Sequence, residues 1–141
     1  MNTTLRRAVL LTTALLAAFV GVWAAFFPMG FYDAFPGLGL TWVAVDGPYN
    51  EHLVRDVGGL YLGFAVASLL AARARSAAPG QVIGAGWAVF GLVHLGYHLE
   101  HLTGSSVDKI GNVVGLGLSL LLGLALVLLP QRETVRAEVA R

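Results

Sequence analysis

Four runs of apolar residues, each long enough to cross a bilayer, constrain the fold of this chain more than any other feature. They cover about residues 8–27, 51–72, 81–102 and 110–129. Because a helix needs about 20 apolar residues to cross the hydrocarbon core, each run predicts one transmembrane helix. The first run exceeds the apolar core of a typical signal peptide, so we interpret it as a retained helix. The sequence therefore predicts an all-α, four-helix transmembrane bundle that forms a single integral membrane domain over residues 1–141.

The composition agrees with a bilayer as the solvent and excludes some functions. Of 141 residues, 57% are hydrophobic and 12% are charged, far from the balance found in soluble domains. The formal net charge of +1 provides no basic surface for nucleic acid, and we expect no nucleic-acid partner. The chain has no cysteine, so any bound metal would be held by nitrogen and oxygen ligands.

The arginines predict how the bundle is oriented. If the four spans alternate in direction, seven arginines fall on one side, and only Arg55 and Lys109 lie near the other. Because lysine and arginine accumulate on the cytoplasmic side, both termini and the loop between the second and third helices are predicted to be cytoplasmic. We expect a multi-pass protein of the cell inner (plasma) membrane, in which residues 131–141 form a solvated helix extension or a frayed end. The seven arginines are Arg6, Arg7, Arg73, Arg75, Arg132, Arg136 and Arg141.

The segment between the first two helices, residues 28–50, is predicted to be a long outward loop rich in aromatic residues. Aromatic rings favour the headgroup level of a membrane. The segment is therefore either a lid folded over the outer helix ends or a belt of interfacial anchors. Its aromatic residues include Phe31, Tyr32, Phe35, Trp42 and Tyr49.

Glycines occur inside the predicted spans at the spacing that lets helices approach closely in lipid. Gly59 and Gly63 form one such pair, and Gly111 and Gly115 form another. Small residues four apart allow two helix backbones to pack together. Both pairs are predicted to pack the bundle itself, or to form a homodimer surface.

All four histidines lie near the predicted outer ends of the second and third helices. At about 100° per residue, His94, His98 and His101 share one face of the third helix. His52 and Asp56 share one face of the second. Because consecutive helices usually pack side by side, the two faces are predicted to converge. Imidazole and carboxylate groups bind zinc, copper or iron, so we predict that these five residues hold a metal ion or a haem.

Five further residues are expected to support this site. Arg55 is predicted to pair with Glu51 one turn away, which leaves Asp56 for the metal. Asp56 is alternatively a partner that orients an imidazole. Asn112 is expected to complete the pocket, Tyr97 to donate a hydrogen bond or to pack, and Glu100 to join an interfacial network. Asp108 is explained by its place at a helix N-terminus.

The polar cluster leaves three functional hypotheses open. The first is a metal or redox site near the extracytoplasmic face that acts on a lipophilic substrate such as a quinone or a lipid. The second is an accessory or scaffold subunit of a larger membrane complex, with a purely structural network of histidines and carboxylates. The third is a small proton-coupled carrier that works as a dimer, although the helix centres contain almost no polar residues to form a path. Whether the chain is an enzyme stays open.

One stretch of the second helix carries a family resemblance. Residues 49–63 contain Asn50-Glu51, Arg55 and the run Gly58-Gly59-Leu60-Tyr61-Leu62-Gly63. This stretch resembles small uncharacterised four-helix bacterial membrane proteins related to the DoxX-like group. The resemblance covers about one helix and the four-span layout, and the histidine-rich third helix has no counterpart in it. It implies the architecture and, by analogy of fold alone, a redox association.

Overall fold

The structure of the chain, a computed structural model, describes residues 2–130 and contains four long helices. Each has 23 residues and is apolar enough to cross a membrane. At about 1.5 Å per residue, each is about 34 Å long, against a hydrocarbon core of about 30 Å. The prediction of an all-helical chain with four helices of spanning length is confirmed. The predicted extension or frayed end at residues 131–141 lies outside the described residues. The long helices are α1 (Thr4–Phe26), α3 (Glu51–Arg73), α4 (Ala78–Glu100) and α5 (Ser106–Leu128).

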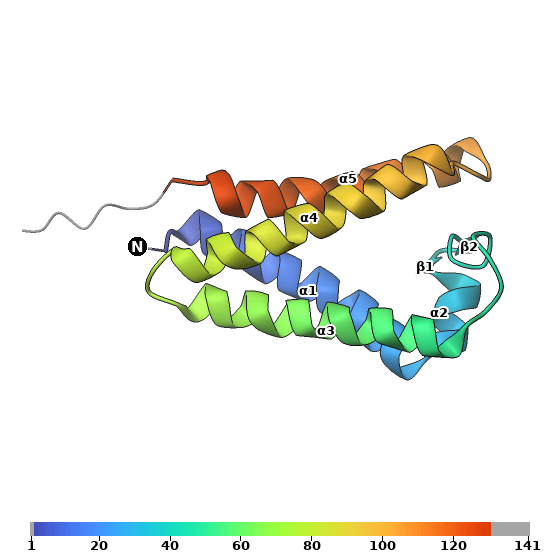
Figure 1. Cartoon of the computed structure of the whole chain (residues 1–141), viewed down its shortest axis with the longest axis horizontal. Helices are drawn as coiled ribbons and strands as arrows, with labels where there is room; N and C mark the ends of the chain where they lie inside the picture. Colours follow the sequence, from blue (N-terminus) through green and yellow to red (C-terminus); the bar gives the residue numbers. More distant parts are fainter. Residues whose placement is uncertain (1, 131–141) are drawn as a thin grey trace, which may run out of the picture.

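The chain between α1 and α3 is more ordered than a plain loop. It forms the short helix α2 (Pro28–Ala34) and the two-residue strands β1 (Pro36–Gly37) and β2 (Leu40–Thr41), which pair antiparallel. Pro28 is the first residue of α2, where its missing N–H costs no hydrogen bond. We call the end of the bundle with these elements and the α4–α5 turn the loop end (Figure 1). The opposite end, with residues 2 and 130, is the terminal end.

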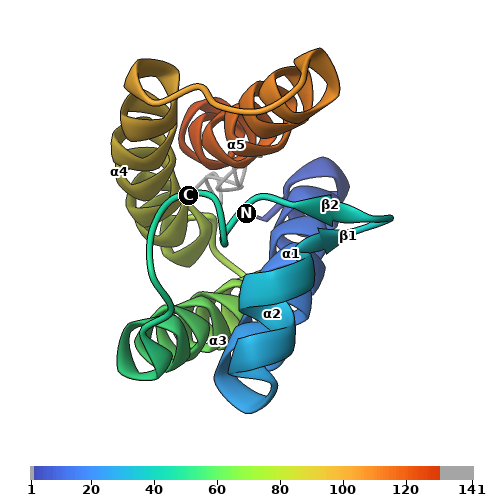
Figure 2. The same cartoon turned by 90° about the vertical axis from the view of Figure 1, so that its right-hand side faces the viewer.

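The four long helices pack as two antiparallel pairs. α1 runs along α3, and α4 runs along α5, whereas the two pairs touch each other much less (Figures 1 and 2). The second and third spans of the sequence, α3 and α4, are therefore not close partners over their length. The expectation that consecutive helices pack side by side is wrong for these two, and this decides where the predicted site residues lie.

Glycines explain why these particular helices pair. A Cβ on Gly58 would overlap the backbone nitrogen of Ala25 in α1. In the other pair, a Cβ on Gly91 would lie 2.8 Å from the Cα of Leu120. Such positions accept only glycine without a shift of the helix, and they bring the backbones close enough for extensive van der Waals contact in lipid.

The predicted glycine pairs are not the ones that pack helices within the chain. A Cβ on Gly59 or Gly63 would have no described atom within 4 Å. Gly58, one residue earlier and about 100° around the helix, makes the close approach instead. Gly111 also contacts no neighbouring helix closely; a Cβ there would lie 2.5 Å from the indole ring of Trp42. The prediction of bundle packing is wrong for both pairs, and a homodimer surface stays a prediction.

Buried residues connect the two pairs at the terminal end and in the middle of the bundle. One cluster contains Leu10, Ala71, Ala72 and Leu126, from α1, α3 and α5. Near the middle, Trp87 of α4 donates a hydrogen bond from its indole nitrogen to the Ser68 hydroxyl of α3, at 3.2 Å. The buried cluster at the loop end draws only on α1, α2 and α3. The α4–α5 pair is therefore not joined to this cluster, and the space between the pairs widens toward the loop end.

The terminal end contains a fully buried arginine. Arg6 is 0% exposed, and one of its terminal nitrogens donates a hydrogen bond to the Leu129 carbonyl at the end of α5. Nearby, Asn2 donates to the carbonyls of Ala71 and Ala74, at the C-terminal end of α3, where helix carbonyls lack the usual intrahelical partners. The Ala71 carbonyl also accepts from the Ala74 N–H. Arg6 is among the arginines of the predicted cytoplasmic side, and in the structure this buried side chain also ties α1 to α5.

The orientation of the bundle stays a prediction, which single-cysteine labelling tests. The chain has no cysteine, so one introduced thiol reports one position. We expect Thr103→Cys, in the exposed α4–α5 turn, to react with a membrane-impermeant maleimide in spheroplasts. Ser76→Cys, in the exposed α3–α4 turn, is expected to react only after permeabilisation. The reverse pattern would place the terminal end outside and contradict the charge-based assignment.

Candidate functional site

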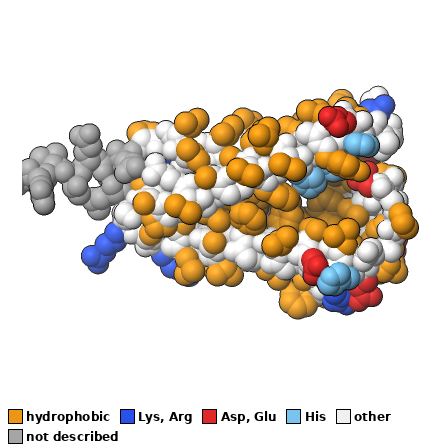
Figure 3. Space-filling model, in the orientation of Figure 1, with side chains coloured by type: hydrophobic (Ala, Val, Ile, Leu, Met, Phe, Trp, Pro, Cys, Tyr) orange, Lys and Arg blue, Asp and Glu red, His pale blue; other side chains and the backbone are white. Residues whose placement is uncertain are grey.

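A cavity of about 760 Å³ lies between the two helix pairs at the loop end. Its size falls within the range of about 300–1,000 Å³ that is common for small-molecule sites. Figure 3 shows the molecule hollowed on the face between α3 and α4, with hydrophobic side chains inside the hollow. All four long helices contribute to its apolar wall, as do α2 and the segment that follows it. Representative lining residues are Phe31, Phe35, Val57, Phe90, Leu116 and Leu122.

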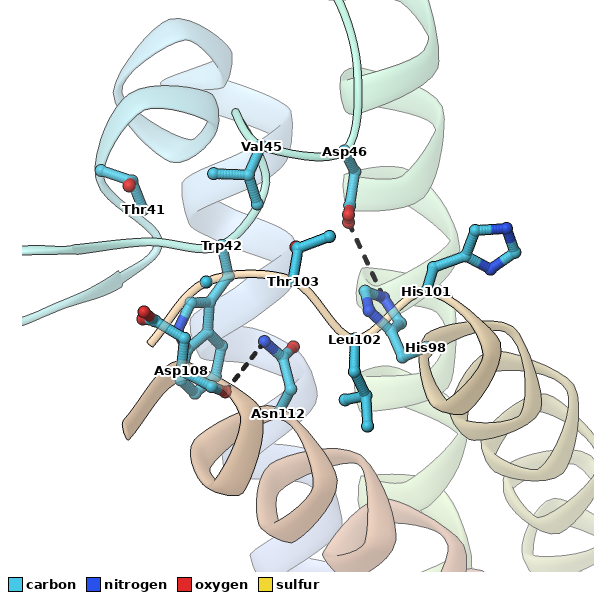
Figure 4. A pocket seen from close by; sticks show the side chains of 11 residues that line it. Thr41, Trp42, Val45, Asp46, His98, His101, Leu102, Thr103, Asp108 and Asn112 are labelled. Atoms are coloured by element: carbon cyan, nitrogen blue, oxygen red, sulfur yellow. Dashed lines mark hydrogen bonds and ion pairs between the residues drawn. The ribbon is translucent and has the colours of Figure 1, made fainter. Parts of the chain in front are cut away.

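Several polar residues of the cavity gather at the loop end, whereas Thr13 and Ser119 lie deeper in its lining. Four of those at the loop end are Asp46 from the segment before α3, His94 and His98 from α4, and Asn112 from α5. The His98 side chain is 14% exposed, and its Nε2 lies 3.9 Å from a carboxylate oxygen of Asp46 (Figure 4). The His94 and His98 rings lie 5.0 Å apart between centroids, one helical turn from each other. The cavity thus has a long apolar body and one polar end.

Among these four residues, His94 has a buried polar atom without a hydrogen-bond partner. Its Nδ1 is buried and has no hydrogen-bond partner among residues 2–130. The ring instead packs edge-on against Phe90, at 5.1 Å between centroids. A buried polar atom without a partner costs about 1–3 kcal/mol. If the ring turns this nitrogen toward the cavity, a ligand that hydrogen-bonds to it recovers that free energy.

Trp42 attaches the segment before α3 to α5. Its indole nitrogen donates a hydrogen bond to Asp108 at 3.1 Å, and its ring lies against Gly111. Asp108 is fixed in turn by Ser105, because the two residues form a capping box at the start of α5. The predicted N-terminal role of Asp108 is confirmed, and its second partner, Trp42, was not foreseen.

Four residues separate the cavity from a smaller pocket at the loop end. Trp42, Asp46, His98 and Asn112 line both the cavity and this second pocket, whose volume is about 50 Å³. Figure 4 shows them coming from the segment before α3, from α4 and from α5. We call these four residues the partition.

The five predicted metal ligands do not come together. His52 and Asp56 pair with each other at 3.2 Å on the surface of α3, where their side chains are 87% and 57% exposed. His101 lies at the end of α4, with its Nδ1 2.8 Å from the Tyr97 carbonyl oxygen. His52 and Asp56 are separate from His94 and His98 because α3 packs against α1 and not along α4. His101 lines the small pocket at the loop end with His98 but does not line the cavity.

No three histidine, aspartate or glutamate side chains within residues 2–130 are placed to hold one metal ion. The predicted convergence of the two helix faces is wrong, because His52 and Asp56 are exposed on the surface of α3. A metal ion or a haem at His94 and His98 stays a prediction.

The predicted supporting residues are also dispersed. The Glu51–Arg55 ion pair is confirmed at 2.8 Å, and Arg55 also donates to the Ala25 carbonyl of α1. It serves the α1–α3 contact and not the cavity. Tyr97 and Asn112 line the cavity, whereas Glu100 is exposed at the end of α4.

Sequence reasoning missed Trp42 and Asp46 as site residues. Trp42 was counted only among the interfacial aromatics, and Asp46 was not singled out. Both lie in an irregular segment, where no helical period indicates which way a side chain points. The sequence signal that was present is weak: Asp46 is an acidic residue in an otherwise apolar stretch.

Comparisons of the chain with protein-family models, with curated proteins and with solved structures find no match. The resemblance of residues 49–63 to the DoxX-like group therefore stays a prediction. The fold and the site by themselves define a protein of four membrane-spanning candidate helices with an apolar cavity that ends at two histidines.

Proposed function

We propose that this protein binds a membrane-resident lipophilic molecule in the cavity, with the polar head of that molecule at His94 and His98. One observation carries the proposal: an apolar cavity of about 760 Å³ is lined at its loop end by His94, whose ring has a nitrogen without a partner among the described residues. Ligand sites typically combine a large apolar wall with a few polar groups that fix orientation.

The lining residues indicate the chemistry of the ligand. Phenylalanine, valine and leucine side chains dominate the wall, so a long aliphatic or ring-containing body is favoured. A histidine nitrogen donates or accepts a hydrogen bond according to its tautomer, so a carbonyl or hydroxyl head group fits equally well. Quinones and single-chain lipids share this chemistry. The proposal needs no catalytic step and no metal.

A fluorescent fatty acid tests the proposal directly. We expect 11-(dansylamino)undecanoic acid to bind the purified protein in detergent saturably, with higher fluorescence because the dansyl group leaves water. Leu116→Trp, which adds a large ring inside the cavity, is expected to weaken binding at least tenfold. The matched control is Val114→Trp on the same helix, because Val114 is 63% exposed and does not line the cavity.

Two further measurements complete the test. Both variants must elute from size-exclusion chromatography like the unmodified protein, so that weaker binding reports a filled cavity and not unfolding. Mass spectrometry of a solvent extract is expected to find a lipophile co-purifying with the unmodified protein and reduced in Leu116→Trp. Equal binding by Leu116→Trp and the unmodified protein, or no saturable binding at all, would refute the proposal.

A further inference from the structure

The partition closes the cavity on the side of the loop end. Trp42 is bonded to Asp108 and packed on Gly111 of α5, and Asp46 lies beside His98 of α4. The same segment also reaches the other helix pair: the Trp42 backbone N–H donates to the Phe35 carbonyl at 2.8 Å, and Phe35 and Val43 pack against the buried cluster of α1, α2 and α3. The segment therefore bridges both pairs across the end of the bundle that is predicted to face water.

A second attachment holds the segment near α2. The Tyr32 hydroxyl donates a hydrogen bond to the Gly47 carbonyl at 2.8 Å. Phe31, 6% exposed, anchors α2 in the buried cluster of α1 and α3. With contacts to α2, α4 and α5, the segment covers the loop end of the cavity.

The cavity is open instead on the side between α3 and α4. Three residues line it and are nevertheless largely exposed: Leu53 at 59%, Val93 at 69% and Tyr97 at 48%. A residue that borders a cavity and the outer surface at once marks an opening. The hollow in Figure 3 lies between these two helices. We call this opening the side portal.

The level of the side portal matches the polar end of the cavity. Val93 lies seven residues, or about 10 Å, from the end of α4, and Tyr97 lies one turn from that end. His94 and His98 occupy the same two turns. In a membrane, exposed apolar residues of a spanning helix face acyl chains, so the side portal opens just below the headgroups. A lipid-like molecule there already has its head at the depth of the histidines.

We infer that the ligand enters sideways from the bilayer through the side portal between α3 and α4, and not from water through the loop end. This inference rests on the proposed function and narrows the ligand to molecules that reside in the membrane. It assigns Trp42 and Asp46 the role of excluding water from the head-group site. Leu16, Phe19 and Leu118 form an exposed apolar margin on the opposite side, between α1 and α5, which is the competing route.

Cross-linking across the side portal tests the route, and the absence of native cysteine makes it specific. In Val57→Cys/Tyr97→Cys, a disulfide-containing bis-maleimide is expected to lower both the association and the dissociation rates of dansylundecanoic acid at least tenfold. Ligand loaded before cross-linking is expected to stay trapped. Cleavage of the linker with a reductant is expected to restore both rates, which separates closure of the portal from damage to the site.

The control ties the same two helices at the terminal end. Leu70→Cys/Ala85→Cys uses two exposed positions that do not line the cavity, and its cross-linked form is expected to keep the rates of the unlinked form. Unchanged rates in the linked Val57/Tyr97 variant would overturn the side route while leaving the binding function intact. Slower exchange on linking Phe19→Cys/Leu118→Cys, with no effect at the side portal, would place the entrance between α1 and α5. Failure of the unmodified protein to bind the probe would refute both proposals.

Discussion

Gly58→Ala is expected to lower the free energy of unfolding by about 2–3 kcal/mol, at the upper end of what overpacking usually costs. The added Cβ would overlap the backbone nitrogen of Ala25, and a backbone cannot rotate away as a flexible side chain can. Relief requires α1 and α3 to separate along the contact that builds this pair. Thermal unfolding in detergent, followed by size-exclusion chromatography after heating, measures the loss.

Gly59→Ala is the matched control for this prediction. No described atom lies within 4 Å of a Cβ at Gly59. Because alanine is a better helix former than glycine, this change is expected to leave stability unchanged or to raise it by up to about 1 kcal/mol. A larger loss at Gly59 than at Gly58 would contradict the helix pairing and would favour the small-residue face predicted from the sequence.

His94→Leu is expected to weaken binding of dansylundecanoic acid by about 5- to 150-fold, which corresponds to about 1–3 kcal/mol for a lost hydrogen bond to a buried group. Leucine is similar in bulk and removes the polar atoms of residue 94 from the cavity lining. The unliganded protein is therefore expected to be equally or more stable, because the unpartnered Nδ1 is removed. Weaker binding together with undiminished stability is the signature of a head-group contact.

His52→Leu provides the comparison for this second prediction. The His52 side chain is 87% exposed and pairs only with Asp56 among the contacts described. Its replacement is expected to leave ligand affinity unchanged. Equal losses from His52→Leu and His94→Leu would instead support the converging five-residue site predicted from the sequence. Metal analysis of the same preparations tests the five-residue metal site independently, because that site predicts bound metal that both substitutions remove.

The spans were predictable because their signal is local. A helix that crosses a membrane needs a long apolar run and little else, and each run lies within one stretch of the chain. The predicted limits of residues 51–72 and the observed helix Glu51–Arg73 nearly coincide. The Glu51–Arg55 ion pair was predictable for the same reason, since both residues lie on one turn of a single helix.

The candidate site was only partly predictable, because it depends on which helices pair. Helical periodicity placed His94 and His98 correctly on one face of the third span. It placed His52 and Asp56 on one face of the second span as well, and they do pair with each other. Helical periodicity does not indicate which other helix, if any, packs against the face with His52 and Asp56. The prediction of a contact between the second and third spans came from the assumption that consecutive helices pack side by side, and that assumption is wrong for α3 and α4.

The sequence by itself determined that the chain suits a lipid bilayer, and it determined the main secondary-structure elements. These are four apolar helices of spanning length and an aromatic segment between the first two. The tertiary structure alone decided the pairing, because a few glycines such as Gly58 and Gly91 let α1 approach α3 and α4 approach α5. The space left between the pairs became the cavity. Asp46 and Trp42 entered the site through contacts between residues far apart in the chain, and no local pattern encodes such contacts.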